Sequence, residues 1–153
     1  MSGGAGPNYL IPDFINQRNP TMDLKDFAPK SDEVEVTVMH PVNGEPLTNE
    51  DGSNMTIVLH APHSKPYKEA MYEQTNKRLK SAQGTGSMDI TAQELEEASL
   101  ELLSKATKAW NITYDEKQPK LTAAKAKAVY DELFWLKPQL EGAINNAEVF
   151  TKA

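Results

Sequence analysis

The sequence predicts a mainly helical α+β domain in which a β-hairpin precedes about four helices. Two observations support this fold class. Residues 33–38 alternate polar and β-branched side chains, which is the pattern of a half-buried strand. From residue 65 onward, apolar side chains instead recur at steps of three or four, as in amphipathic helices. The length of 153 residues suits one domain with at most a small appendage.

The predicted hairpin spans residues 33–60, and residues 55–60 form its second strand. Between the strands, Asn43-Gly44 and Asp51-Gly52 supply the positive-φ positions that tight turns require. An isolated hairpin is only marginally stable in water. We therefore expect its apolar face to pack against a helix.

The predicted helices cover residues 65–82, 92–110, 122–134 and 138–148. The first has a thin apolar side and is expected to lie on the surface. The second is the best defined, because Thr91 and Glu94 have the spacing of a capping box. Its expected inward stripe consists of Leu95, Ala98, Leu102, Ala106 and Ala109. Pro138 begins the last helix, where a missing N–H costs little.

Residues 1–30 have no sustained hydrophobic period and are rich in proline and glycine. They predict a flexible arm that docks when a partner is present, and a partly ordered tail without a role is an equal alternative. Residues 31–153 then form a single domain.

Composition excludes several classes of partner. The formal net charge of −6 argues against general nucleic-acid binding and against an anionic membrane surface. The chain has no cysteine, so a disulfide framework and a thiolate metal site are excluded. No apolar run approaches the ~20 residues that span a bilayer, and the first residues lack the pattern of a secretory signal.

The three histidines, His40, His60 and His63, are the candidates for a metal site. If Val38 faces Thr56 across the hairpin, His60 faces residue 34 and lies roughly 20 Å from His40 at ~3.3 Å per residue. A shared zinc ion needs each ligand within ~2.1 Å. On that register the histidines are polar residues at strand ends, and we expect no metal or cofactor.

Catalytic groups are also not indicated. The glutamates of the second helix, Glu94, Glu96, Glu97 and Glu101, are expected on its solvated side, whereas paired catalytic carboxylates need a cleft. Ser64 and Ser99 have no sequence setting that suggests an activating base. The sequence therefore predicts a protein that is not an enzyme.

The aromatic residues of the last third remain as candidate protein-binding residues: Trp110, Tyr130, Phe134, Trp135 and Phe150. Aromatic side chains dominate the energetics of both cores and interfaces. We assign Trp110, Tyr130 and Phe134 to the core. Trp135 and Phe150 lie at the ends of elements, where core and interface are equally good interpretations.

Two blocks of sequence carry a resemblance to a known family. The first is His40-Pro41-Val42-Asn43-Gly44-Glu45-Pro46-Leu47, followed by the helix entry at residues 62–67. The second is Ala109-Trp110-Asn111-Ile112, followed by a helix with Val129-Tyr130 and a short helix that ends near Phe150. In their order and spacing, residues from about 22 to 152 resemble the tail assembly chaperones of long-tailed bacteriophages. The first 21 residues have no counterpart in that pattern.

The resemblance implies a non-enzymatic protein of the host cell cytoplasm. Such chaperones bind the tape measure protein, keep it soluble, recruit tail tube subunits and leave before the virion matures. A homo-oligomer is compatible with this role. The alternative is a structural virion protein of the tail or neck, in which the N-terminal arm ties neighbouring subunits together.

Overall fold

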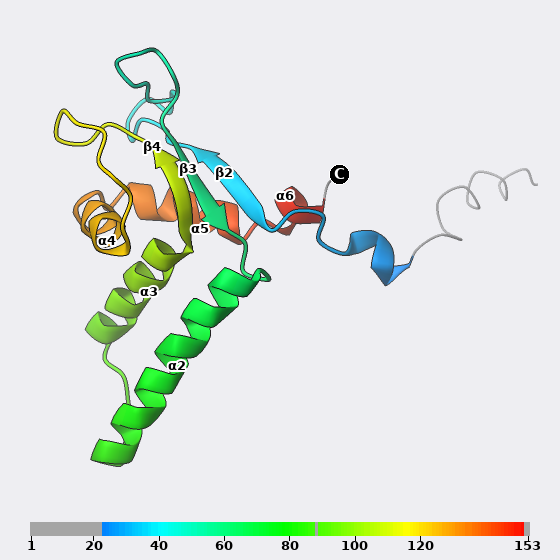
Figure 1. The fold of residues 1–153 in the computed structure, drawn as a ribbon, viewed down its shortest axis with the longest axis vertical. Helices are drawn as coiled ribbons and strands as arrows, with labels where there is room; N and C mark the ends of the chain where they lie inside the picture. Colours follow the sequence, from blue (N-terminus) through cyan, green and yellow to red (C-terminus); the bar gives the residue numbers. More distant parts are fainter. Residues whose placement is uncertain (1–22, 88, 152–153) are drawn as a thin grey trace, which may run out of the picture.

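The computed structural model describes residues 23–87 and 89–151 (Figure 1). About half of the chain is helical, and the predicted α+β, mainly helical fold class is confirmed. The elements are η1 (Leu24–Phe27), β2 (Glu33–Thr37), β3 (Thr56–His60), α2 (Lys65–Thr85), α3 (Ala92–Ala106), β4 (Thr107–Asn111), α4 (Ala123–Glu132), α5 (Leu136–Ile144) and α6 (Ala147–Thr151). Most of the predicted arm lies outside the described residues. Its last residue, Lys30, donates a backbone hydrogen bond of 2.7 Å to the Phe150 carbonyl.

The predicted hairpin is present, but its register differs by one residue from the prediction. Strands β2 and β3 are antiparallel, and Val34 pairs with Leu59 while Val36 pairs with Ile57. These four side chains are buried on one face of the sheet. The predicted register would instead have placed Val34 opposite His60. A shift of one residue moves every side chain of a strand to the other face, so burial of Ile57 and Leu59 selects the observed register.

A third strand, β4, was predicted as the end of a helix. The helix expected over residues 92–110 stops at Ala106, and Thr107–Asn111 pairs antiparallel with β3 to give the order β2-β3-β4. The buried Thr107 hydroxyl donates to the Leu103 carbonyl at 3.0 Å and lies 2.7 Å from the Tyr130 hydroxyl. Pairing with β3 satisfies the backbone groups on one side of this edge strand and gives the hairpin a third strand, which favours a stable sheet.

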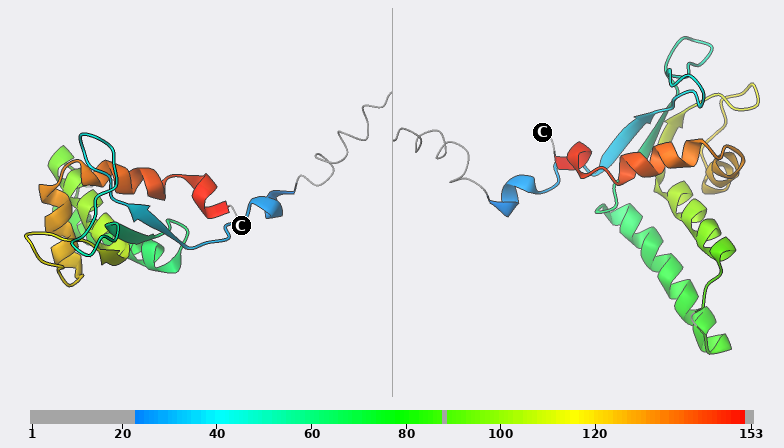
Figure 2. Two further views of the ribbon diagram at one scale, coloured as in Figure 1. Left: turned by 90° about the horizontal axis from the view of Figure 1, so that it is seen from above. Right: turned by 180° about the vertical axis from the view of Figure 1, so that it is seen from behind.

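Helices α3, α4 and α5 supply the other half of the core. Helix α3 packs on α4 and β4, and α5 packs on β2 and β3 (Figure 2). The predicted inward stripe of α3 is right only in part: Ala106 is buried as expected, but Leu95 is 53% exposed. Leu100, Leu103 and Ser104, which the stripe left out, are buried instead. The reason is that α3 has two neighbours. Its apolar side faces the core and α4, and the side with Ala98 faces α2 through polar contacts.

Helices α2 and α3 form a hairpin that extends away from the sheet (Figures 1 and 2). Helix α2 has 21 residues and a length of about 32 Å at 1.5 Å per residue. All of its residues are described, and Ala70 alone is buried. The helix ends at Thr85 and is capped by Gly86, whose left-handed φ of 75° lets its N–H close the last turn on the Ala82 carbonyl. Most of α2 is therefore surface.

Candidate functional site

Three of the five candidate aromatic residues stabilise the fold. Tyr130 is 1% exposed and Phe150 is 4% exposed, so the assignment of Tyr130 to the core is confirmed. Trp110 is half-buried against the core, and its Nε1–H donates to the Pro119 carbonyl at 2.9 Å. Its ring meets Tyr130 edge-on with centroids 6.5 Å apart. The side chains of Tyr130 and Phe150 are not accessible to a partner in this structure.

Phe134 was expected in the core, and this prediction is wrong because the side chain is 81% exposed. Helix α4 ends at Glu132, two residues earlier than predicted, and the Leu133 N–H closes its last turn on the Val129 carbonyl. Phe134 therefore falls in the turn between α4 and α5. Its neighbour Trp135 is the N-cap residue of α5 and packs in part against the core. Of the predicted set, Phe134 and the exposed part of Trp135 offer aromatic surface at this turn.

The histidines have structural partners. His60 pairs with Glu33 rather than with residue 34, in keeping with the shifted register. His63 Nε2 lies 2.9 Å from the Ser31 carbonyl and 3.2 Å from an Asp32 carboxylate oxygen. His40 Nδ1 accepts hydrogen bonds from the backbone N–H groups of Val42 and Asn43. Within residues 23–87 and 89–151, no three His, Asp or Glu side chains gather closely enough to hold a metal ion.

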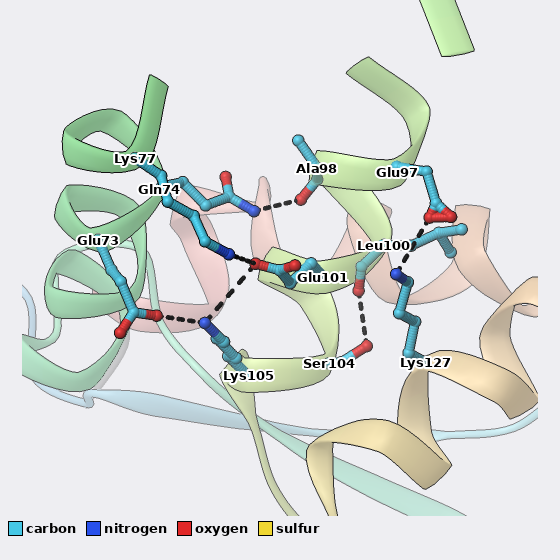
Figure 3. A network of polar contacts seen from close by, with 10 residues as sticks. All are labelled: Glu73, Gln74, Lys77, Glu97, Ala98, Leu100, Glu101, Ser104, Lys105 and Lys127. Carbon is cyan, nitrogen blue, oxygen red and sulfur yellow. Dashed lines mark hydrogen bonds and ion pairs between the residues drawn. The ribbon is translucent and has the colours of Figure 1, made fainter. Parts of the chain in front are cut away.

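A network of polar contacts joins α2 to α3 (Figure 3). Lys105 of α3 pairs with Glu73 of α2 and lies 3.6 Å from Glu101. Lys77 of α2 lies 3.9 Å from the same Glu101 carboxylate. The hydrogen bond from Lys105 lowers the pKa of Glu73 and, reciprocally, raises the pKa of Lys105. Exposed ion pairs of this kind each contribute at most about 1 kcal/mol, so α2 is held loosely compared with the core.

A side-chain amide of α2 also contacts α3. Gln74 Nε2 donates to the Ala98 carbonyl at 2.7 Å (Figure 3). The opposite side of α3 is attached more firmly, since Leu100 and Leu103 are buried in the core there. Glu97 also pairs with Lys127 of α4 at 3.0 Å. Helix α3 is therefore fixed by the domain, and α2 is attached to α3.

A groove of about 540 Å³ lies between the two helices toward the tip of the hairpin. Its lining combines both signs of charge with apolar groups and includes Lys77, Arg78, Ile90, Glu94, Ala98 and Glu101. The Thr91 backbone and hydroxyl, with Arg78 further away, lower the pKa of Glu94. Three of the groove's carboxylates have donors as partners: Glu94 accepts from the Thr91 N–H, Glu97 pairs with Lys127, and Glu101 lies near Lys77 and Lys105.

The face of α2 that points away from α3 is also distinctive. Tyr72 is 59% exposed and Leu79 is 46% exposed, seven residues further along. The ammonium groups of Lys65, Lys68 and Lys80 make no ion pair or hydrogen bond with the described part of the chain. Helix α2 carries five basic and two acidic side chains in a protein of net charge −6. A basic, partly apolar helix thus projects from an acidic domain.

Sequence reasoning placed residues 65–82 on the surface but did not identify them as a binding element. The available signal was the segregation of charge. Lysine and arginine concentrate in the predicted first helix, and glutamate concentrates at the start of the next. Neither feature indicates that the two helices pair and project from the sheet, because that depends on tertiary packing.

Comparison of the chain with protein-family models, with curated proteins and with solved structures gave no match. Across residues 23–87 and 89–151, none of the helices combines the length and apolar character needed to cross a bilayer. The features that bear on function are therefore the chain's own: the exposed turn at Phe134 and the projecting hairpin of α2 and α3.

Proposed function

We propose that this protein is a non-enzymatic tail assembly chaperone that binds the helical tape measure protein of a long-tailed bacteriophage and recruits tail tube subunits. The observation that carries the proposal is α2, a helix of 21 residues with a single buried side chain, held outward on α3. A helix that contributes so little to the core retains almost its whole length for contacts with another protein. The family resemblance of residues 22–152 supports the same role.

The hairpin suits the recognition of a long helix. A partner helix can lie along α2 or in the groove beside it, where apolar groups bind and charged side chains set the register. Each such contact is small, and exposed charge pairs contribute little individually. Many copies bound along one scaffold would still cover it, because attachment to a common partner raises the effective concentration of neighbouring sites.

Phe134 provides a second contact on the domain body. Its side chain is 81% exposed, and a large aromatic side chain is able to anchor an interface by filling a pocket on a partner. Two separate contact regions are what the proposed role requires, because the chaperone joins the tape measure protein to tube subunits.

Co-expression with the tape measure protein tests the proposal. We expect the tape measure protein to become soluble and to co-purify with this chain, and we expect the complex to bind tail tube subunits. Tyr130→Ala removes a core side chain and serves as the control for unfolding. It should abolish co-purification only because the variant unfolds. Failure of the folded protein either to co-purify or to improve solubility would contradict the proposal.

Analysis of purified particles by mass spectrometry separates the proposal from its alternative. A chaperone that leaves before maturation is absent from the virion. A structural tail or neck protein is present at a stoichiometric level, and this result would favour the alternative.

A further inference from the structure

The outer face of α2 has the spacing of a coiled-coil seam. Lys65, Tyr72 and Leu79 recur at every seventh position, and Lys68 and Thr75 occupy the intermediate positions. These side chains lie on one side of the helix, because residues three, four and seven apart share a face. The contacts with α3 come from the other side, through Ala70, Glu73, Gln74 and Lys77. Within residues 23–87 and 89–151, α3 therefore leaves the seam uncovered.

The seam combines two exposed apolar side chains with lysines. Tyr72 and Leu79, which are 59% and 46% exposed, are the apolar members. Lys65 and Lys68 lie toward the start of the helix, and Lys80 flanks its second half. Glu69 lies beside this face, while the other glutamate of α2, Glu73, pairs with Lys105. The three lysines are without ionic partners in the described residues, so with Glu69 alone beside them an incoming helix would meet net positive charge on this face.

We infer that the outer face of α2 binds an acidic amphipathic helix of a partner protein, whose apolar stripe covers Tyr72 and Leu79 and whose carboxylates pair with Lys65, Lys68 and Lys80. This inference rests on the proposed function and specifies the charge of the helix that the chaperone recognises. Charge complementarity favours this occupant over a second copy of α2. Two copies would bring together helices that each carry five basic and two acidic side chains.

Two synthetic peptides test the inference on the full-length protein. They share a leucine heptad stripe about four heptads long, and they carry either glutamate or lysine at the flanking positions. Binding is measured by titration calorimetry. We expect the acidic peptide to bind about tenfold tighter than the basic peptide, since three exposed charge pairs each add a small favourable contribution.

Two variants and their matched controls locate the site. The triple variant K65E/K68E/K80E should reverse the peptide preference. The control K25E/K30E/K120E changes the net charge equally at exposed lysines elsewhere and should keep the preference. Tyr72→Ala combined with Leu79→Ala should weaken binding of the acidic peptide about tenfold. Leu95→Ala, at an exposed leucine of α3, should not. Circular dichroism verifies that each variant is folded.

Several results would overturn the inference. One is equal affinity for the two peptides, and another is no binding of the acidic peptide. A third is that K25E/K30E/K120E changes the peptide preference as much as K65E/K68E/K80E does. The fourth is that the wild-type protein sediments as a dimer and that K65E/K68E/K80E abolishes this dimer. Other results distinguish this inference from the proposed function. If the acidic peptide binds at α2 but the tape measure protein does not co-purify, the binding surface is supported and the chaperone function is contradicted. If the tape measure protein co-purifies equally well with K65E/K68E/K80E, the chaperone function is supported, but α2 is not the surface that binds the tape measure protein.

Discussion

The sheet core and the α2–α3 hairpin are stabilised by different kinds of interaction. In the core, valine, isoleucine and leucine side chains of β2 and β3 are sealed by α3, α4 and α5, and Ile57, Leu59 and Leu140 have no exposed surface. Helix α2 buries only Ala70 fully and packs Tyr67 in part against the core near its start, and its other listed contacts with α3 are ion pairs and one side-chain amide. Burial of apolar surface is worth far more than exposed ion pairs. The comparison indicates that the sheet core provides most of the stability and that the α2–α3 hairpin provides surface for binding.

The largest effect should come from Tyr130, at the centre of the core. Tyr130→Ala removes a ring that is 1% exposed and leaves a cavity beside Trp110, so unfolding should become easier by about 3–5 kcal/mol. Urea denaturation followed by tryptophan fluorescence measures this change. The milder Tyr130→Phe removes the hydroxyl near Thr107 and should cost about 1 kcal/mol. If Tyr130→Ala lowers the free energy of unfolding by less than about 1 kcal/mol, the core is not the main source of stability and does not differ from the hairpin in this respect.

The core was also the region where sequence reasoning worked best, and its errors have tertiary causes. The alternation in β2 correctly predicted a strand. The register could not be predicted, because it depends on which face of β3 is buried, and Ile57 and Leu59 decide that. The strand Thr107–Asn111 was missed because Ala106 and Ala109 continue the helical spacing. Pairing with β3 overrides this local pattern.

The hairpin was harder to predict because its determinants lie far apart in sequence. Residues 65–82 were correctly expected at the surface, and the capping box of Thr91 and Glu94 is present. That α2 lies against Glu101 and Lys105 depends on charge pairs between helices, which no single-helix pattern contains. Phe134 was assigned to the core because it continues the helical spacing of Val129, Tyr130 and Leu133. Helix α4 instead ends at Glu132, and the Phe134 side chain is 81% exposed.

Alkaline pH should produce the second largest effect, again in the core. Burial raises the pKa of Tyr130 from 10.0 to about 12, against a smaller lowering by the hydrogen bond with Thr107. Because the folded pKa is above the unfolded one, the stabilisation is complete below pH 10 and is lost as pH rises toward 12. The loss should be about 2–3 kcal/mol. Comparing the free energy of unfolding at the two ends of this range in wild type and Tyr130→Phe isolates the contribution. The same loss in both proteins would show that Tyr130 does not cause it.

The third effect should be smaller and confined to the hairpin. Replacing Lys105 by Met and Glu73 by Gln removes the main ion pair between α2 and α3. The global free energy of unfolding should fall by less than about 1 kcal/mol, because the pair is partly exposed. Native-state hydrogen exchange should nevertheless show faster opening of α2 amides and unchanged protection of β3. Equal loss of protection in both elements would mean that the hairpin and the core unfold as one unit.

The smallest stability effect should come from Phe134→Ala. The side chain is 81% exposed, so the free energy of unfolding should change by no more than about 0.5 kcal/mol. If the turn between α4 and α5 contacts a partner, the same substitution should still weaken capture of tail tube subunits in the co-expression assay, because truncation of an aromatic anchor commonly costs more than 1 kcal/mol of binding. Val42→Ala, at an 87% exposed loop residue, is the matched control. Unchanged capture by the Phe134 variant would assign binding to the hairpin alone, and a stability loss above 1 kcal/mol would show that Phe134 belongs to the core after all.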